Sequence, residues 1–125
     1  MPKRLLIAVS LVLALAAAGE AAEGGGAPFD GDLQRLAEIL GSLQYLRGLC
    51  GANEGTKWLD QMQALIEAEA PKGERRDRMV ASFNRGYRGF QQTYRVCTPA
   101  ADFVIRRYLD EGSKIAREIT ARYGN

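Results

Sequence analysis

The sequence has 125 residues, the length of a single domain, and its 46% hydrophobic content is ordinary for a globular protein. Its formal net charge is +2, so the chain as a whole is not a polycation, and it contains no histidine. Histidine is the commonest general base, metal ligand and pH switch, so its absence argues against several classes of enzyme and metalloprotein.

The N-terminal residues have the pattern of a secretory signal peptide. Lys3 and Arg4 precede an uncharged apolar run over residues 5–18, and small residues follow it. The run is shorter than the roughly 20 residues that a membrane-spanning helix needs. We therefore expect a signal peptide over residues 1–21, cleavage after Ala21 and a periplasmic protein. The alternative is an uncleaved N-terminal membrane anchor.

Residues 22–29 are expected to form a flexible lead-in, and residues 30–125 a helical domain. Asp30 or Asp32 can cap its first helix, in which leucines recur at helical spacing up to Cys50. The glycine that follows this cysteine suits a left-handed C-terminal cap, and a glycine inside the helix, Gly41, indicates a close helix crossing.

The second helix follows a connector over residues 50–56, and either Asn53 or Thr56 can cap it. Trp58 then starts a helical pattern and is expected to anchor this helix on its neighbours. Pro71 ends the pattern.

The third helix is predicted over residues 74–96. Apolar residues form one face of it, and we expect the stretch 79–99 to organise the fold. Gly86 and Gly89 are costly inside a helix, which indicates either close packing or a ligand groove beside them. Thr98 can cap a fourth helix that begins at Pro99.

No period-two strand pattern is present, so the sequence predicts an all-α fold, a compact four-helix up-and-down bundle preceded by a signal peptide. In such a bundle the first and third helices end on the same side. A disulfide between Cys50 and Cys97, which close those helices, is therefore geometrically natural. The alternative is a redox-active pair, but the cysteines are not in a C-x-x-C motif.

Arginines are concentrated between residues 75 and 107, where only Asp77 and Asp102 oppose them. Guanidinium groups bind phosphate and carboxylate in a bidentate fork, so this flank is a candidate anion-binding face. The alternative is a solvated flank whose arginines pair with the first two helices. The candidate binding residues are Asn84, Arg85, Tyr87, Arg88 and Arg95.

The sequence shows no phosphate-binding glycine loop, no nucleophile elbow and no metal-ligand cluster. We therefore expect no catalytic residues, no metal and no cofactor. An enzyme that uses an unrecognised carboxylate is the least favoured reading.

Several motifs resemble a family of small, uncharacterised, exported alphaproteobacterial proteins with two well-separated cysteines. They are Tyr45-Leu46-Arg47, Leu49-Cys50-Gly51, Trp58, Phe83-Asn84-Arg85-Gly86-Tyr87-Arg88 and Cys97-Thr98. The resemblance implies a Gram-negative periplasm or cell envelope and no particular activity. Relatives often carry a histidine before the Tyr-Leu-Arg motif, where this chain has Gln44, which puts any role of that histidine in doubt here.

The sequence therefore predicts a non-catalytic periplasmic binding or accessory protein that contacts an anionic envelope component or a protein through its arginine-rich helix face. We expect no nucleic-acid partner, because the chain is predicted to be exported. The alternative is a structural homo-oligomer without a ligand.

Overall fold

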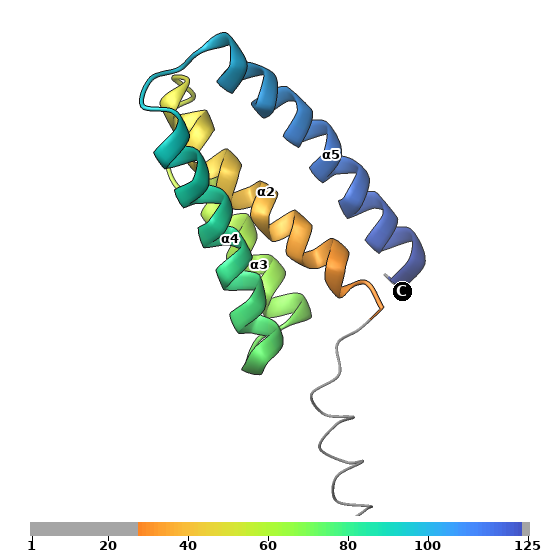
Figure 1. Cartoon of the computed structure of the whole chain (residues 1–125). Helices are drawn as coiled ribbons and strands as arrows, with labels where there is room; N and C mark the ends of the chain where they lie inside the picture. The colour runs from red at the N-terminus through yellow and green to blue at the C-terminus, as the bar shows by residue number, and fades with distance from the viewer. Residues whose placement is uncertain (1–27, 124–125) are drawn as a thin grey trace, which may run out of the picture.

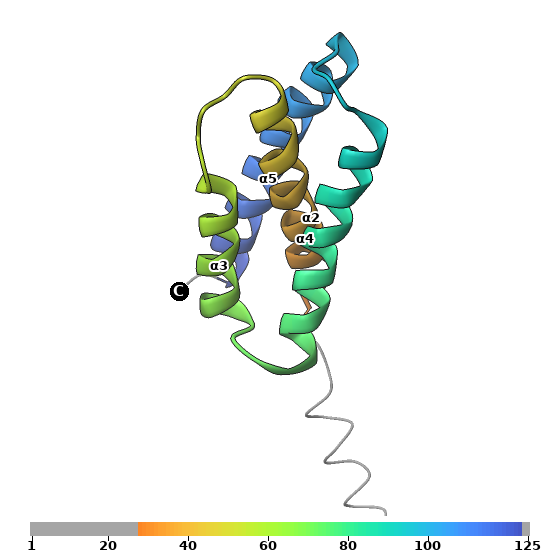
Figure 2. The same cartoon turned by 90° about the vertical axis from the view of Figure 1, so that its left-hand side faces the viewer.

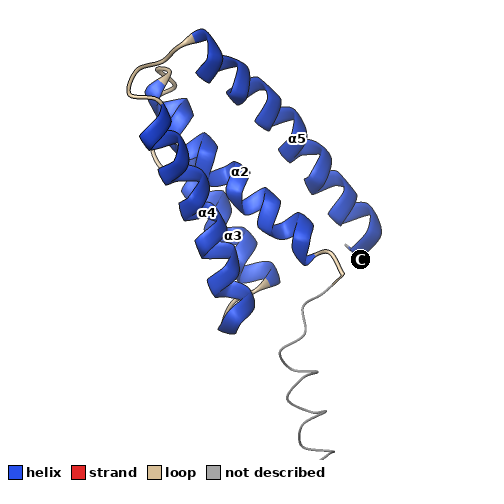
Figure 3. Cartoon of the chain, in the orientation of Figure 1, coloured by secondary structure: helices blue, strands red, loops and turns tan. Residues whose placement is uncertain are grey.

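A computed structural model describes residues 28–123, and these residues form four helices and no strand (Figure 3). The helices are α2 (Asp30–Leu49), α3 (Lys57–Glu69), α4 (Gly73–Thr93) and α5 (Pro99–Tyr123). Successive helices run in opposite directions (Figures 1 and 2). The predicted all-α four-helix bundle is confirmed for this part of the chain. The predicted signal peptide and residues 22–27 of the lead-in lie outside it.

The central element is α2, because α3, α4 and α5 each pack against it while α3 and α5 make no close backbone contact with each other. Its middle is buried on every side, since the five consecutive residues 39–43 are all buried. A helix that is buried all round lies inside a fold rather than on its surface. The fold is therefore organised around α2, and the expectation that residues 79–99 play this part is wrong.

The tightest helix contact joins α2 to α4. A Cβ atom on Gly41 would collide with the carbonyl oxygen of Phe83, and one on Gly86 would collide with the carbonyl oxygen of Glu38. The same carbonyl accepts a 2.8 Å hydrogen bond from the Ser42 hydroxyl. Both glycines thus let two backbones approach, which confirms close packing at Gly41 and at Gly86.

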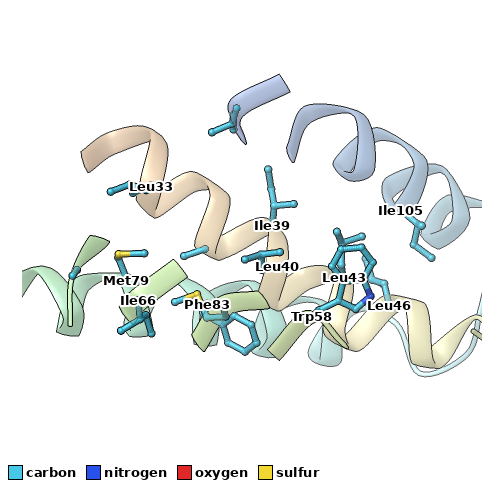
Figure 4. Packing of buried hydrophobic residues seen from close by; sticks show 14 of the residues in the cluster. Leu33, Ile39, Leu40, Leu43, Leu46, Trp58, Ile66, Met79, Phe83 and Ile105 are labelled. Carbon is cyan, nitrogen blue, oxygen red and sulfur yellow. The ribbon is translucent and has the colours of Figure 1, made fainter. Parts of the chain in front are cut away.

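The hydrophobic core surrounds α2 and receives side chains from all four helices (Figure 4). Trp58 is buried in it, as expected for a helix anchor. The buried hydrophobic residues are Leu33, Ala37, Ile39, Leu40, Leu43, Leu46, Trp58, Met62, Ile66, Ala70, Met79, Phe83, Ala101, Ile105 and Ile115.

The helix ends follow some of the predicted caps. After α2, Gly51 has a positive φ of 91°, and its N–H bonds to the Gly48 carbonyl while that of Ala52 bonds to the Arg47 carbonyl. This is the paired pattern of a Schellman cap, so the predicted left-handed cap is confirmed. The predicted cap of α5 is also confirmed, because the Thr98 hydroxyl accepts a 3.1 Å hydrogen bond from the Ala101 N–H.

Other helix ends differ from the prediction. Phe29, rather than Asp30 or Asp32, occupies the N-cap position of α2, and its side chain packs against the core. The third helix ends at Thr93 instead of continuing to residue 96. Tyr94 has extended backbone angles, and the Tyr45 hydroxyl donates a hydrogen bond to its carbonyl. This contact holds the extended link that leads from α4 to Cys97.

Cys50 and Cys97 form a disulfide with Cα atoms 4.9 Å apart. The bond joins the end of α2 to the link between α4 and α5, at the same end of the bundle (Figure 1). The pairing predicted from helix directions is therefore confirmed, and the alternative of a redox-active pair has no structural support.

The connector between α2 and α3 is held by Glu54. Its carboxylate accepts hydrogen bonds from Arg47 at 2.8 and 2.9 Å and from the Trp58 indole at 3.2 Å. The bonds from Arg47, followed by that from Trp58, lower the pKa of Glu54 from 4.5 to about 2.

This lowered pKa predicts an acid-dependent loss of stability. The charged Glu54 stabilises the fold above its ordinary pKa of 4.5, and this contribution is lost as the pH falls towards 2. Urea unfolding at about pH 6 and about pH 2.5 should therefore show a smaller loss of stability in Glu54→Gln than in the unaltered chain. The matched control is Glu67→Gln, which changes an exposed glutamate of α3 that forms no ion pair with a described residue. Equal acid sensitivity in Glu54→Gln and the unaltered chain would contradict the assignment.

Candidate functional site

The five candidate binding residues follow one side of α4 and the link after it, but they are not equally available. Asn84, Arg85, Arg88 and Arg95 are exposed, whereas Tyr87 is half-buried. The ring of Tyr87 meets that of Tyr45 edge to face, with centroids 5.5 Å apart. Tyr87 therefore contributes to packing, and its role in a binding site stays a prediction.

Arg85 belongs to a charge network that crosses from α4 over α2 to α5. Its guanidinium lies 3.6 Å from the carboxylate of Glu38, which is also 3.7 Å from Arg35. Arg35 in turn donates a 3.0 Å hydrogen bond to Glu111, and this bond lowers the pKa of Glu111. The charge of Arg85 is thus partly neutralised within the fold.

Other arginines of the flank also have partners. Arg75 donates to the carboxylate of Asp30 at 2.8 Å, Arg78 lies 3.7 Å from Glu74, and Arg106 lies 3.5 Å from Asp102. Arg75 and Arg85 thus pair with α2, as the alternative of a flank paired with the first two helices expects, whereas Arg78 and Arg106 pair within their own helices.

Four arginines of the flank form no ion pair with another described residue: Arg76, Arg88, Arg95 and Arg107. The last three follow one another along the second half of α4, the link after it and the start of α5. We call residues 84–107 the basic corner; this segment contains five arginines and one carboxylate, that of Asp102. Arg88, Arg95 and Arg107 are exposed and form no ion pair with another described residue. After the hydrogen bond from Arg35, Arg107 also contributes electrostatically to the lowered pKa of Glu111, one turn further along α5, but it forms no direct ion pair with that carboxylate. All three guanidinium groups present exposed N–H donors to an anion from solution.

The basic corner also exposes two large apolar side chains, Val96 in the link and Phe103 on α5. On α5, Phe103 is exposed and its neighbour Val104 is half-buried, an orientation not predicted from the sequence. The helical spacing of Ala101, Ile105 and Tyr108 could have predicted that Phe103 points outward. These three residues share the inner face of α5, and Phe103 lies two positions from both Ala101 and Ile105.

Another surface feature is an apolar cleft of about 540 Å³ between α3 and α5. Leu36 and Leu40 of α2 lie in it, and small residues of the flanking helices, such as Ala64 and Ala116, line its sides. The cleft lies where α3 and α5 both pack on α2 without close backbone contact with each other. It can accept an apolar side chain or a hydrocarbon group.

A family model for a protein of unknown function, DUF2385, matches residues 28–123. The chain belongs to the DUF2385 family. This confirms membership of an uncharacterised family, while the alphaproteobacterial origin and the export of the chain stay predictions. No curated protein and no solved structure matches it.

In this DUF2385 chain, Gln44 has a role that sequence reasoning missed. Its side-chain oxygen accepts a 3.1 Å hydrogen bond from the N–H of Leu59, and its amide donates at 3.0 Å to the carbonyl of Gly55. Leu59 is the third residue of α3, so Gln44 caps that helix from α2. Thr56, one of the two predicted caps, occupies the N-cap position of α3, but its hydroxyl donates to Asp60 and makes no cap hydrogen bond. The sequence holds no local signal for a cap supplied from 15 residues away.

Among the residues of this DUF2385 chain that the structure describes, no group of three or more acidic or cysteine side chains is placed to hold a metal ion. Within residues 28–123, no helix is both long and apolar enough to cross a membrane. The basic corner and the apolar cleft each offer a surface to a partner.

Proposed function

We propose that this protein is a non-catalytic binding or accessory protein of the periplasm or cell envelope that holds an anionic partner at its basic corner. The observation that carries the proposal is the set of exposed arginines of the basic corner that form no ion pair with another described residue, Arg88, Arg95 and Arg107. A cluster of one charge sign raises the local concentration of ligands of the opposite sign.

The location rests on two features. The predicted signal peptide would direct the chain out of the cytoplasm. The Cys50–Cys97 disulfide suits an oxidising compartment such as the bacterial periplasm.

The test is binding of the mature, oxidised chain to immobilised lipopolysaccharide, a polyanionic probe, at low and at high salt. We expect Arg88→Gln combined with Arg95→Gln to weaken binding by about twenty-fivefold, at roughly fivefold for each arginine near an anionic surface. Raising the salt should weaken binding of the unaltered chain, because exposed charges are screened.

The matched control is Arg76→Gln combined with Arg117→Gln, which removes two exposed, unpaired arginines outside the basic corner. This control should bind within about twofold of the unaltered chain. An equal loss in both double variants would show that net charge alone matters, and it would contradict the proposed site.

The apolar cleft favours a second candidate function, a structural homo-oligomer in which a second copy covers the groove between α3 and α5. Sedimentation equilibrium distinguishes it from the first. A dimer that Ala116→Glu disrupts would favour this candidate, since Ala116 is exposed on the wall of the cleft. A monomer at all concentrations would exclude it.

A further inference from the structure

Resting on the proposed function, we propose that the anionic partner is the surface of a phospholipid bilayer, and that Phe103 and Val96 insert into it while the arginines of the basic corner bind lipid phosphates. The inference concerns the class of partner and the way in which it is held.

Two large apolar side chains are exposed at the basic corner. Val96 is 67% exposed and Phe103 57%, and they are the large hydrophobic residues that the described part of the chain leaves open to solvent. Other large apolar side chains of residues 28–123 are buried or packed against the core. An apolar group that the core does not use gains free energy when it enters another apolar phase.

Helix α5 directs Phe103 away from the bundle. Ala101 and Ile105 are buried against the rest of the bundle, so Phe103, midway between them, lies on the opposite, outward side of the helix. Arg106 and Arg107 follow Phe103 by three and four residues, and residues at those spacings are neighbours on a helix surface. Phe103 is therefore flanked by two exposed guanidinium groups, of which that of Arg106 lies 3.5 Å from the carboxylate of Asp102.

The link before α5 carries a basic and an apolar residue beside the disulfide. Arg95 and Val96 are adjacent and exposed, and the next residue, Cys97, is bonded to Cys50. The Thr98 cap fixes the start of α5 directly after the disulfide. The link and the first turns of α5 together form one end of the molecule (Figure 1). The basic corner therefore carries its apolar and basic groups on a turn that the disulfide and the Thr98 cap hold in place.

This combination fits a bilayer better than a soluble polyanion. A glycan or a free phosphate can satisfy the arginines, but it offers no apolar phase to Phe103 and Val96. A bilayer surface offers phosphates and, just beneath them, acyl chains. Neither the binding of phosphates by the arginines nor the insertion of the two apolar side chains is a large contribution by itself. Membrane binding should therefore require both and should be reversible.

The test is flotation of the mature, oxidised chain with vesicles of phosphatidylglycerol and phosphatidylethanolamine, compared with vesicles of phosphatidylcholine alone. We expect binding to the anionic vesicles only. Phe103→Ser should weaken it roughly tenfold through loss of apolar burial. Arg107→Gln should weaken it about fivefold, whereas the control Arg76→Gln should change it by less than about twofold. Phe103 is exposed, so Phe103→Ser should keep the melting temperature of the unaltered chain.

Tryptophan placed at Phe103 (Phe103→Trp) gives a direct readout of insertion. Its fluorescence should shift to the blue with anionic vesicles and should be quenched by lipids that carry a quencher on the acyl chain. Binding that Phe103→Ser leaves unchanged, or a tryptophan that stays in water, would overturn insertion. Lipopolysaccharide binding that survives when vesicle binding is absent would overturn this inference and leave the proposed function standing. Loss of both would overturn both.

Discussion

Replacing Cys50 and Cys97 together by serine is expected to lower the free energy of unfolding by about 4 kcal/mol. The bond closes a chain segment of 47 residues, and without it the unfolded chain gains the freedom that this loop now lacks. A domain of this size has a total stability of about 5–15 kcal/mol, so the loss would be a large share. Urea unfolding at neutral pH, followed by circular dichroism, measures it.

The control for this prediction is chemical reduction. A reducing agent should destabilise the unaltered chain by about the same amount and should leave the double serine variant unchanged. If the unfolding midpoints of the variant and the unaltered chain coincide, the disulfide contributes nothing to stability.

The second large effect is expected at the crossing of α2 and α4. Gly86→Ala should destabilise the fold by about 3 kcal/mol, because the new methyl group meets the Glu38 carbonyl and lies 2.7 Å from the Ser42 hydroxyl oxygen. The carbonyl belongs to the backbone of the central helix, so the collision is relieved only if the helices separate.

Gly89→Ala is the matched control for this change. Gly89 lies three residues further along α4, is exposed, and has no atom near the position of a new Cβ. Alanine there should stabilise the helix by about 0.5–1 kcal/mol. The two substitutions should thus shift the melting temperature in opposite directions. A stabilising effect at Gly86 would show that the helices are not in contact there.

The outline of the fold could be predicted from the sequence because its signals are local. The Thr98 cap, the glycine after Cys50 and the helical spacing of apolar residues each depend on a few neighbours along the chain. The pairing of the cysteines followed from the alternation of helix directions, a property of the whole bundle that short connections impose.

The centre of the fold and the make-up of the site could not be predicted in this way. Gly41 and Gly86 each looked like a crossing point, but their joint role depends on two helices meeting. Likewise, the partial neutralisation of Arg85 depends on Glu38, a residue of another helix. Once such pairs are known, the flank arginines without an ion pair to another described residue are Arg76 and the three of the basic corner, Arg88, Arg95 and Arg107, a division that the sequence alone does not give.

The central claim is that the basic corner is the surface that binds an anionic partner. The most direct measurement is an NMR titration of the isotope-labelled, oxidised mature chain with short-chain phosphatidylglycerol held below its micelle concentration. We predict that the backbone signals that shift lie within residues 88–107, and that Arg88→Gln combined with Arg95→Gln reduces the shifts. Shifts confined to the walls of the apolar cleft, with residues 88–107 unchanged, would contradict the claim.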